Sequence, residues 1–136
     1  MADELLLEIV TPEEMVFSNQ VEDVYIPGAE GVFGGLINHA PLLSAIKTGE
    51  LHFHRDGKET SYAVGEGYAE VVSDRVTVLV ETCDRADRID IDKVRQKKEE
   101  LEKRVAELQK DTPEAEKAKV ELALAETRLK VAEMGK

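Results

Sequence analysis

Three histidines are the first candidates for catalytic or metal chemistry in this chain. His52 and His54 alternate along one predicted strand and would point to the same face, where imidazole nitrogens could approach a metal ion. His39 could serve as a base for Ser44, but no nucleophile-elbow pattern surrounds that serine. No cysteine or further histidine completes a metal set. Solvent-facing histidines are therefore favoured, and a metal-dependent hydrolase using His39, His52 and His54 is the enzyme alternative.

Two other features that often carry chemistry lack the required pattern. The glycines at 31, 34 and 35 do not have the spacing of a phosphate-binding loop, and no Lys-Ser or Lys-Thr pair ends the segment. Cys83 is the single cysteine, which excludes an internal disulfide and suits a reducing cytoplasm; we expect it to pack as a small apolar side chain. The many carboxylates are scattered, as on a solvated acidic face. No pattern argues for catalysis.

Composition excludes several classes of protein. The chain has 136 residues and a formal net charge of −11. Such an acidic protein repels phosphate backbones, so nucleic-acid binding is not expected. The N-terminus has acids where a secretory signal has bases, and no stretch approaches the roughly 20 apolar residues of a membrane span.

The character of the chain changes near Arg88. Before it, apolar and polar residues alternate in short runs; after it, apolar residues recur every three or four positions. Residues 1–89 contain 17 acidic and 6 basic side chains, and residues 90–136 contain 12 of each, so the net charge lies on the first part. The sequence predicts a β domain over 1–87 and a helical domain over 88–136.

The β domain is predicted to contain many short strands. They are expected at 5–10, 15–17, 21–26, 51–55, 60–64, 68–72 and 76–80. Asp56-Gly57 is the strongest hairpin signal. Ser18-Asn19 and Ser73-Asp74 are predicted as further turns, and the segment around His39 as a loop. Turns at such close, regular spacing are typical of a sandwich or flattened barrel.

The second domain is predicted to be two antiparallel helices of about 20 residues each. The interruption at 111–113 suits a helix start, with a capping residue followed by proline. The apolar stripe of the second helix is mostly alanine: Ala115, Ala118, Leu122, Ala125, Leu129 and Ala132. Alanine buries little area, so the helices gain little from each other. Val120, Leu124 and Val131 form a second apolar edge that needs a partner, either the sandwich or another protein. The hairpin is therefore expected to be detachable.

Residues 31–43, GVFGGLINHAPLL, resemble the G-x-[LF]-G-aliphatic-x-P-x-H-x-P-L-[LV] stretch of the epsilon subunits of bacterial F-type ATP synthases, which correspond to the delta subunits of mitochondria. The segments VTP, GEGYAEV and RLKVAEM agree with the same family in the same order. Gly35 and Ile37 depart from the family, which has an aliphatic residue and proline there. The resemblance extends over essentially the whole chain.

The resemblance implies an α+β protein, an N-terminal all-β sandwich of about ten strands followed by a C-terminal antiparallel two-helix hairpin. It also implies a non-catalytic central-stalk subunit that couples proton flow to ATP synthesis. The expected partners are the gamma subunit, the c-ring and the alpha/beta catalytic hexamer. The expected location is the cytoplasmic face of the bacterial inner membrane, with attachment only through these partners. Glu30, Phe33, Asn38 and His39 fall in the family's loop for ring and stalk contact.

The resemblance further implies that the hairpin is mobile and inhibits ATP hydrolysis when it extends into the hexamer. Some family members bind ATP as a regulatory ligand through an I-D-x-x-R-A motif. Ile91, Asp92 and Arg95 match this motif, whereas Gln96 replaces the alanine. Arg128 on the second helix could face the same phosphates, for which guanidinium is well suited. The competing interpretation is a capping acid with an arginine one turn later on a solvated helix. No cofactor is required.

An alternative interpretation of the same two helices places the protein in another class. A free-standing coiled-coil adaptor or chaperone-like protein would self-associate through the second apolar edge, at Val120, Leu124 and Val131. Sedimentation would then show a stable dimer, which distinguishes this alternative from a subunit that joins a larger complex.

Overall fold

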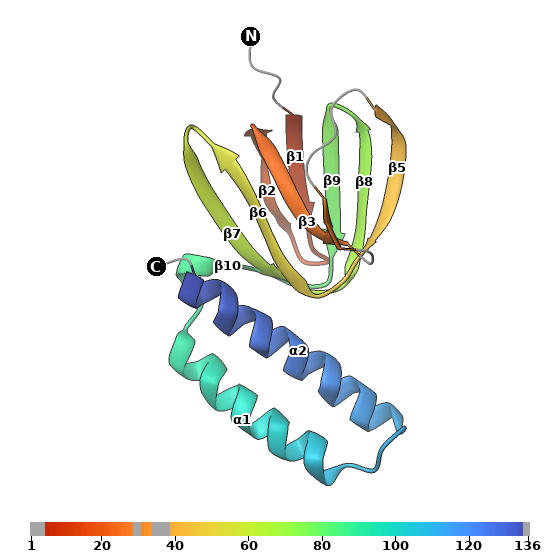
Figure 1. Ribbon diagram of the computed structural model, residues 1–136, viewed down its shortest axis with the longest axis vertical. Coiled ribbons are helices and arrows are strands. Elements are labelled where there is room, and N and C mark those ends of the chain that lie inside the picture. The colour runs from red at the N-terminus through yellow and green to blue at the C-terminus, as the bar shows by residue number, and fades with distance from the viewer. Residues whose placement is uncertain (1–4, 29–30, 34–38, 135–136) are drawn as a thin grey trace.

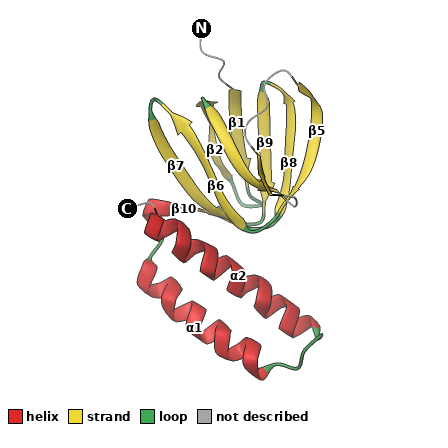
Figure 2. Ribbon diagram, viewed as in Figure 1, coloured by secondary structure: helices red, strands yellow, loops and turns green. Residues whose placement is uncertain are grey.

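A computed structural model describes residues 5–28, 31–33 and 39–134. Within these residues, ten strands precede two long helices (Figures 1 and 2). The strands are β1 (Leu5–Val10), β2 (Met15–Val21), β3 (Asp23–Gly28), β4 (Gly31–Phe33), β5 (His39–Ile46), β6 (Gly49–Arg55), β7 (Lys58–Val64), β8 (Gly67–Ser73), β9 (Arg75–Val80) and β10 (Cys83–Arg85). The helices are η1 (Ala86–Arg88), a 3₁₀ turn, followed by α1 (Ile91–Glu107) and α2 (Pro113–Met134). The predicted α+β architecture is confirmed.

The strands form two facing layers joined through β3. Their order is β10-β7-β6-β3-β5-β8-β9-β1-β2, and β4 pairs with β3. The first part of β3 pairs with β6, and its last residue, Gly28, pairs with Ile46 of β5. We call β10-β7-β6-β3 the helix-side sheet and β5-β8-β9-β1-β2 the opposite sheet. Figure 1 shows the helical hairpin at one end of the sandwich, beside β7 and β10.

The hydrophobic core lies between the two sheets. Strand alternation turns every second side chain inward, as in β1, where Leu5, Leu7 and Ile9 are buried. Phe53 from the helix-side sheet packs on Phe17 of β2, with 4.6 Å between ring centroids. The core cluster contains only sandwich residues. The sandwich therefore has a core of its own, without side chains from α1 or α2.

The predicted turn at Ser18-Asn19 is wrong. β2 continues through these residues to Val21 and pairs with β1 along its length. Strand β2 ends the strand order, and its polar residues are exposed. A strand at that position tolerates polar side chains because few of them must face the core. The polar run consequently resembled a turn in the sequence.

The predicted loop around His39 is also wrong at that residue. His39 begins β5, which pairs with β8 from His39 to Ile46. Proline removes a backbone donor, yet Pro41 fits because the register shifts between His39 and Leu42. The short strand β10 was also missed, because its three residues show too little alternation to be recognised.

The two predicted hairpin turns are confirmed. Asp56 and Gly57 both have positive φ, 55° and 76°, and Arg55 pairs directly with Lys58 across the turn. Such a two-residue turn matches the twist of the flanking strands. The second turn lies between Val72 and Arg75, which pair across β8 and β9.

Both helices begin at capping residues. Asp90 accepts a hydrogen bond from the backbone N–H of Lys93 at 3.2 Å, and Thr112 Oγ1 accepts one from Ala115 N–H at 3.2 Å. Helix α2 lies between α1 and the sandwich (Figure 1). The alanine stripe of α2 is buried as predicted, except for Leu122, which is half-buried.

Gly67 offers a test of the β8–β9 packing. A Cβ atom at this position would overlap the carbonyl oxygen of Leu79 on the neighbouring strand. We expect Gly67→Ala to lower the free energy of unfolding by about 3 kcal/mol, because backbone atoms cannot move aside cheaply. The matched control is Gly57→Ala, where nothing lies within 4 Å and only the positive φ opposes a side chain, at a cost of about 1–2 kcal/mol. Denaturant unfolding measures both; equal losses would contradict the steric account.

Candidate interaction surfaces

The outer face of the opposite sheet carries a row of apolar side chains. Val10, Leu79, Tyr68 and Ala45 lie side by side on four neighbouring strands, because each pairs with the next across the sheet. Tyr68 is 57% exposed and Leu79 is 50% exposed. Leu43, one row further along β5, is 69% exposed. Contiguous exposed apolar side chains commonly mark a protein-interaction site. We call these residues, Leu43 included, the apolar row.

A shallow hollow of about 390 Å³ adjoins the apolar row at the end of the sheet. Its lining includes Val10, Pro12, Tyr68, Leu79 and Val80. Close packing of β8 and β9 at Gly67 forms part of its floor. The sequence contained the alternation that exposes these residues, but only the strand register showed that they are neighbours.

The predicted ring- and stalk-contact loop lies partly outside the described residues. Glu30 and Asn38 are not among them. The backbone of Phe33 pairs with Ile26 in β4, and the backbone of His39 pairs with Ser73 at the start of β5. The role of this loop stays a prediction.

The hairpin contacts the sandwich through the last turns of α2. Ala63 is fully buried although it lies on the outer face of β7, opposite Glu50, and it is outside the sandwich core cluster. Val131 of α2 is likewise 0% exposed. Beside them, Arg128 Nε donates to Asp84 Oδ2 of β10 at 2.8 Å. We call these four residues, Ala63, Asp84, Arg128 and Val131, the docking contact.

The second apolar edge of α2 is covered only at one end. Val131 is buried, Leu124 is half-buried, and Val120 is 48% exposed. Figure 1 shows that α2 diverges from the sandwich in the same direction: the loop joining α1 to α2 lies farther from the strands than the end of α2. The prediction that this edge needs a partner is confirmed for its C-terminal end.

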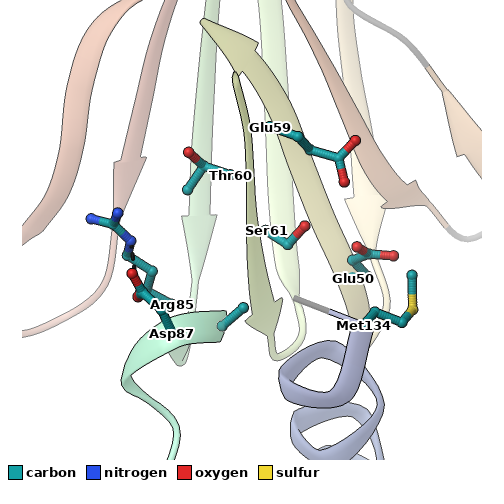
Figure 3. Close-up of a pocket in the computed structure, with 8 residues that line it drawn as sticks. Glu50, Glu59, Thr60, Ser61, Arg85, Asp87 and Met134 are labelled. Atoms are coloured by element: carbon teal, nitrogen blue, oxygen red, sulfur yellow. Dashed lines mark ion pairs between the residues drawn. The ribbon is translucent and has the colours of Figure 1, made fainter. Parts of the chain in front are cut away.

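A cavity of about 270 Å³ lies just beyond the end of α2 (Figure 3). Glu59 and Ser61 of β7, Glu50 of β6 and Met134 of α2 line it. The rest of the lining is Thr60, Arg85, Ala86 and Asp87, and Arg85 forms an ion pair with Asp87, with 3.1 Å between Nε and Oδ1. The cavity is therefore polar and carries more carboxylates than cations.

Of the three residues predicted to bind ATP, Asp92 and Arg95 lie together, whereas Arg128 lies elsewhere and contacts Asp84. Arg95 lies 3.8 Å from Asp92 and donates to Glu133 at 3.3 Å. Their common cavity also holds Asp87 and Asp90, so it is acidic. Arg128 does not line it and is bound to Asp84 instead. ATP binding stays a prediction, and phosphates would compete there with the carboxylates that both arginines now contact.

The remaining candidate residues from the sequence are Cys83, His52 and His54. Burial raises the pKa of the Cys83 thiol to about 12, with a smaller contribution from Asp84, and the side chain packs against the sandwich core as predicted. His52 and His54 lie on one face of β6, as expected. In the described part of the chain, no group of three or more His, Cys, Asp or Glu side chains could hold a metal ion.

A family model, ATP synthase, Delta/Epsilon chain, beta-sandwich domain, matches residues 4–86. The chain belongs to the ATP synthase delta/epsilon family. As a member of this family it is a subunit of ATP synthase. The matched residues end where η1 begins, so the family match covers the sandwich.

Curated relatives in bacteria support the same membership. An ATP synthase epsilon chain of Nitratidesulfovibrio vulgaris (strain DP4) is 47% identical over 106 residues, which cover 78% of this chain and 79% of the relative. That of Geotalea uraniireducens (strain Rf4) is 46% identical over 95 residues, covering 70% and 69%.

Solved structures share the fold of this family member. One is a chain from the Euglena gracilis mitochondrial ATP synthase, OSCP/F1/c-ring, with a TM-score of 0.79, 20% identity and coverage of 92% of this chain and 79% of that one. A second is from the Tetrahymena thermophila mitochondrial ATP synthase, central stalk/c-ring, with a TM-score of 0.58, 12% identity and coverage of 94% and 96%. In the part that the structure describes, no helix of this subunit is long and apolar enough to cross a membrane.

The docking contact of this subunit can be tested by neutralising one of its side chains, the carboxylate of Asp84. Asp84→Asn removes the charge that Arg128 binds but keeps the size of the side chain. We expect hairpin docking to weaken by about 1 kcal/mol, roughly fivefold, so that amides of α2 exchange faster while the sandwich core stays protected. Hydrogen exchange measures this.

The matched control for this variant is Glu133→Gln. It removes the Arg95 contact within the hairpin, where both side chains are 56% exposed, and it should leave exchange in α2 unchanged. Equal protection of α2 in Asp84→Asn and the unaltered chain would contradict the importance of the docking contact.

Proposed function

We propose that this protein is a non-catalytic central-stalk subunit of a proton-translocating F-type ATP synthase, in which it couples proton flow to ATP synthesis. The observation that carries the proposal is the placement of two different contact surfaces on opposite sheets. The apolar row lies on the opposite sheet, and the docking contact lies on the helix-side sheet. One surface can therefore remain bound to the stalk while the other releases the hairpin.

The apolar row is the proposed site for the gamma subunit. Its side chains come from β1, β9, β8 and β5, so a single partner surface could cover four strands at once. Exposed Tyr and Leu side chains gain free energy when a partner covers them, and aromatic side chains are enriched at interfaces. The c-ring is assigned to the loop that includes Glu30, Phe33, Asn38 and His39.

The hairpin is the proposed regulator of ATP hydrolysis. Its contacts with the sandwich, at the last turns of α2, include the buried side chains of Val131 and Ala63 and one ion pair. A fully buried valine contributes about 2 kcal/mol, and a partly exposed ion pair about 1 kcal/mol or less. A gap of a few kcal/mol can be shifted by a partner that binds the released form better. The alpha/beta hexamer is that partner in this proposal.

The proposed location follows from the partners. The subunit lies at the cytoplasmic face of the bacterial inner membrane and is attached there through the gamma subunit and the c-ring. The solved structures that share its fold support this place, since they come from the F1, central stalk and c-ring parts of mitochondrial ATP synthases.

Assembly tests the apolar row. We expect Leu79→Ser to weaken binding to the gamma subunit by about 2 kcal/mol, roughly 30-fold, because an exposed apolar anchor is lost from the centre of the row. Val120→Ser on α2 is the control: it changes a side chain of similar exposure outside the row and should bind normally. Titration calorimetry with purified gamma subunit gives both affinities. Absence of binding by the unaltered chain, with a stable dimer in sedimentation, would support a free-standing adaptor instead.

Removal of the hairpin tests the regulation. A chain ending at Arg88 keeps every residue of the sandwich core cluster, so we expect it to fold and to join the complex. The assembled enzyme should hydrolyse ATP faster than the enzyme with the complete chain, since no hairpin can enter the hexamer. Steady-state ATPase assays on both complexes measure the difference. Equal rates at equal subunit content would mean that the hairpin does not inhibit.

A further inference from the structure

Three strands of the helix-side sheet are bridged by one histidine on their outer face. Asp23 of β3, His54 of β6 and Glu59 of β7 are direct cross-strand partners and form one row. His54 Nδ1 lies 2.8 Å from Asp23 Oδ1, and His54 Nε2 lies 3.1 Å from Glu59 Oε1. The backbone N–H of His54 also donates to Asp23 Oδ1 at 3.1 Å. The imidazole thus contacts a carboxylate at each ring nitrogen.

The two carboxylates require a particular protonation state of this ring. A neutral imidazole has one N–H donor and one lone pair, whereas an imidazolium has two donors. Ionised carboxylates only accept hydrogen bonds. In the neutral ring, one nitrogen lone pair would therefore face a carboxylate oxygen and repel it. Only protonated His54 satisfies both contacts.

The other groups near His54 do not compensate for this repulsion. The ring of His52, on the same strand, lies 6.1 Å away with its plane nearly perpendicular. Tyr25 of β3 approaches edge-on at 6.5 Å. The hydrogen bond to Asp23 is the main cause that raises the pKa of His54 above its ordinary value of 6.5; the charge of Asp23 and the contact with Glu59 add to it, and burial opposes it. Because the two carboxylates lie on opposite sides of the ring, they do not converge as metal ligands.

We propose that His54 is a proton-dependent clamp that ties β3 to β7 across β6 and is closed when the imidazole is protonated. The clamp lies on the sheet against which the hairpin docks. Glu59 belongs both to the clamp and to the cavity that Met134 lines at the end of α2 (Figure 3). A proton on His54 therefore holds Glu59 in place on the wall of this cavity. The inference is independent of the proposed function and can be tested on the isolated chain.

The direction of the pH effect follows from the raised pKa. A group that binds its proton more tightly in the folded state stabilises the fold below the unfolded pKa, about 6.5 for histidine. That contribution is lost as the pH rises through the higher folded pKa. The clamp is therefore closed below about pH 6.5 and opens as the pH rises through the folded-state pKa of His54.

The first experiment follows the histidine ring signals of the complete chain by NMR from pH 5 to pH 9. We expect a His54 midpoint above 6.5 that falls in Asp23→Asn and falls less in Glu59→Gln. Both variants keep a hydrogen-bond acceptor of the same size. A His54 midpoint at or below 6.5, or one that neither variant shifts, would overturn the clamp.

The second experiment compares thermal unfolding of the unaltered chain and His54→Gln at several pH values. The unaltered chain should have the higher melting temperature at pH 6, and the difference should shrink as the pH rises past the His54 midpoint. A melting-temperature difference that is constant with pH would refute the proton dependence.

The third experiment tests transmission to the hairpin. The ε-methyl signal of Met134 should shift with the same midpoint as His54 in the unaltered chain and should lose this inflection in His54→Gln. A Met134 signal that does not follow His54 would show that the clamp ends at Glu59, against the proposed link to α2.

Discussion

The contact between the last turns of α2 and the outer face of β7 and β10 joins the two parts of this molecule, and it is small. Val131 of α2 and Ala63 of β7 are both fully buried there, and Arg128 binds Asp84. The sandwich does not need this contact, because its core cluster contains no hairpin residue. The hairpin, by contrast, has an alanine-rich seam that buries little area when the helices are alone. The docking contact therefore helps to hold the helices against the sandwich.

A sandwich of two sheets suits a subunit with two separate contact surfaces. The inner faces of both sheets are used by the common core, which leaves each outer face available for a separate task. The apolar row occupies one outer face and the histidine clamp occupies the other, while the hairpin docks at one end of the clamp's sheet. A change at the helix-side sheet can therefore occur without exposing the core or disturbing the apolar row. This separation is compatible with a subunit of ATP synthase that stays assembled while its hairpin moves.

Local patterns were sufficient for most elements of the fold. Alternation identified β1, the β6–β7 hairpin and the β8–β9 hairpin. Asp56-Gly57 marked the turn between β6 and β7, because few residues other than glycine, asparagine and aspartate tolerate positive φ. The helical periods and the start at Pro113 were equally readable. The errors fell where the local pattern was ambiguous: β2 has polar residues where it lies exposed at the end of the sheet, and β5 contains a proline within an irregular register.

The sequence by itself determined the break near Arg88, the character of both parts and the weakness of the helix–helix seam, since these depend on residue types and their period along the chain. Only the tertiary structure decided which surface residues become neighbours. The apolar row joins residues from β1, β9, β8 and β5, and the clamp joins three strands, because strand order and register bring them together. Register depends on the packing of the whole sandwich, and no segment of the chain contains that information alone.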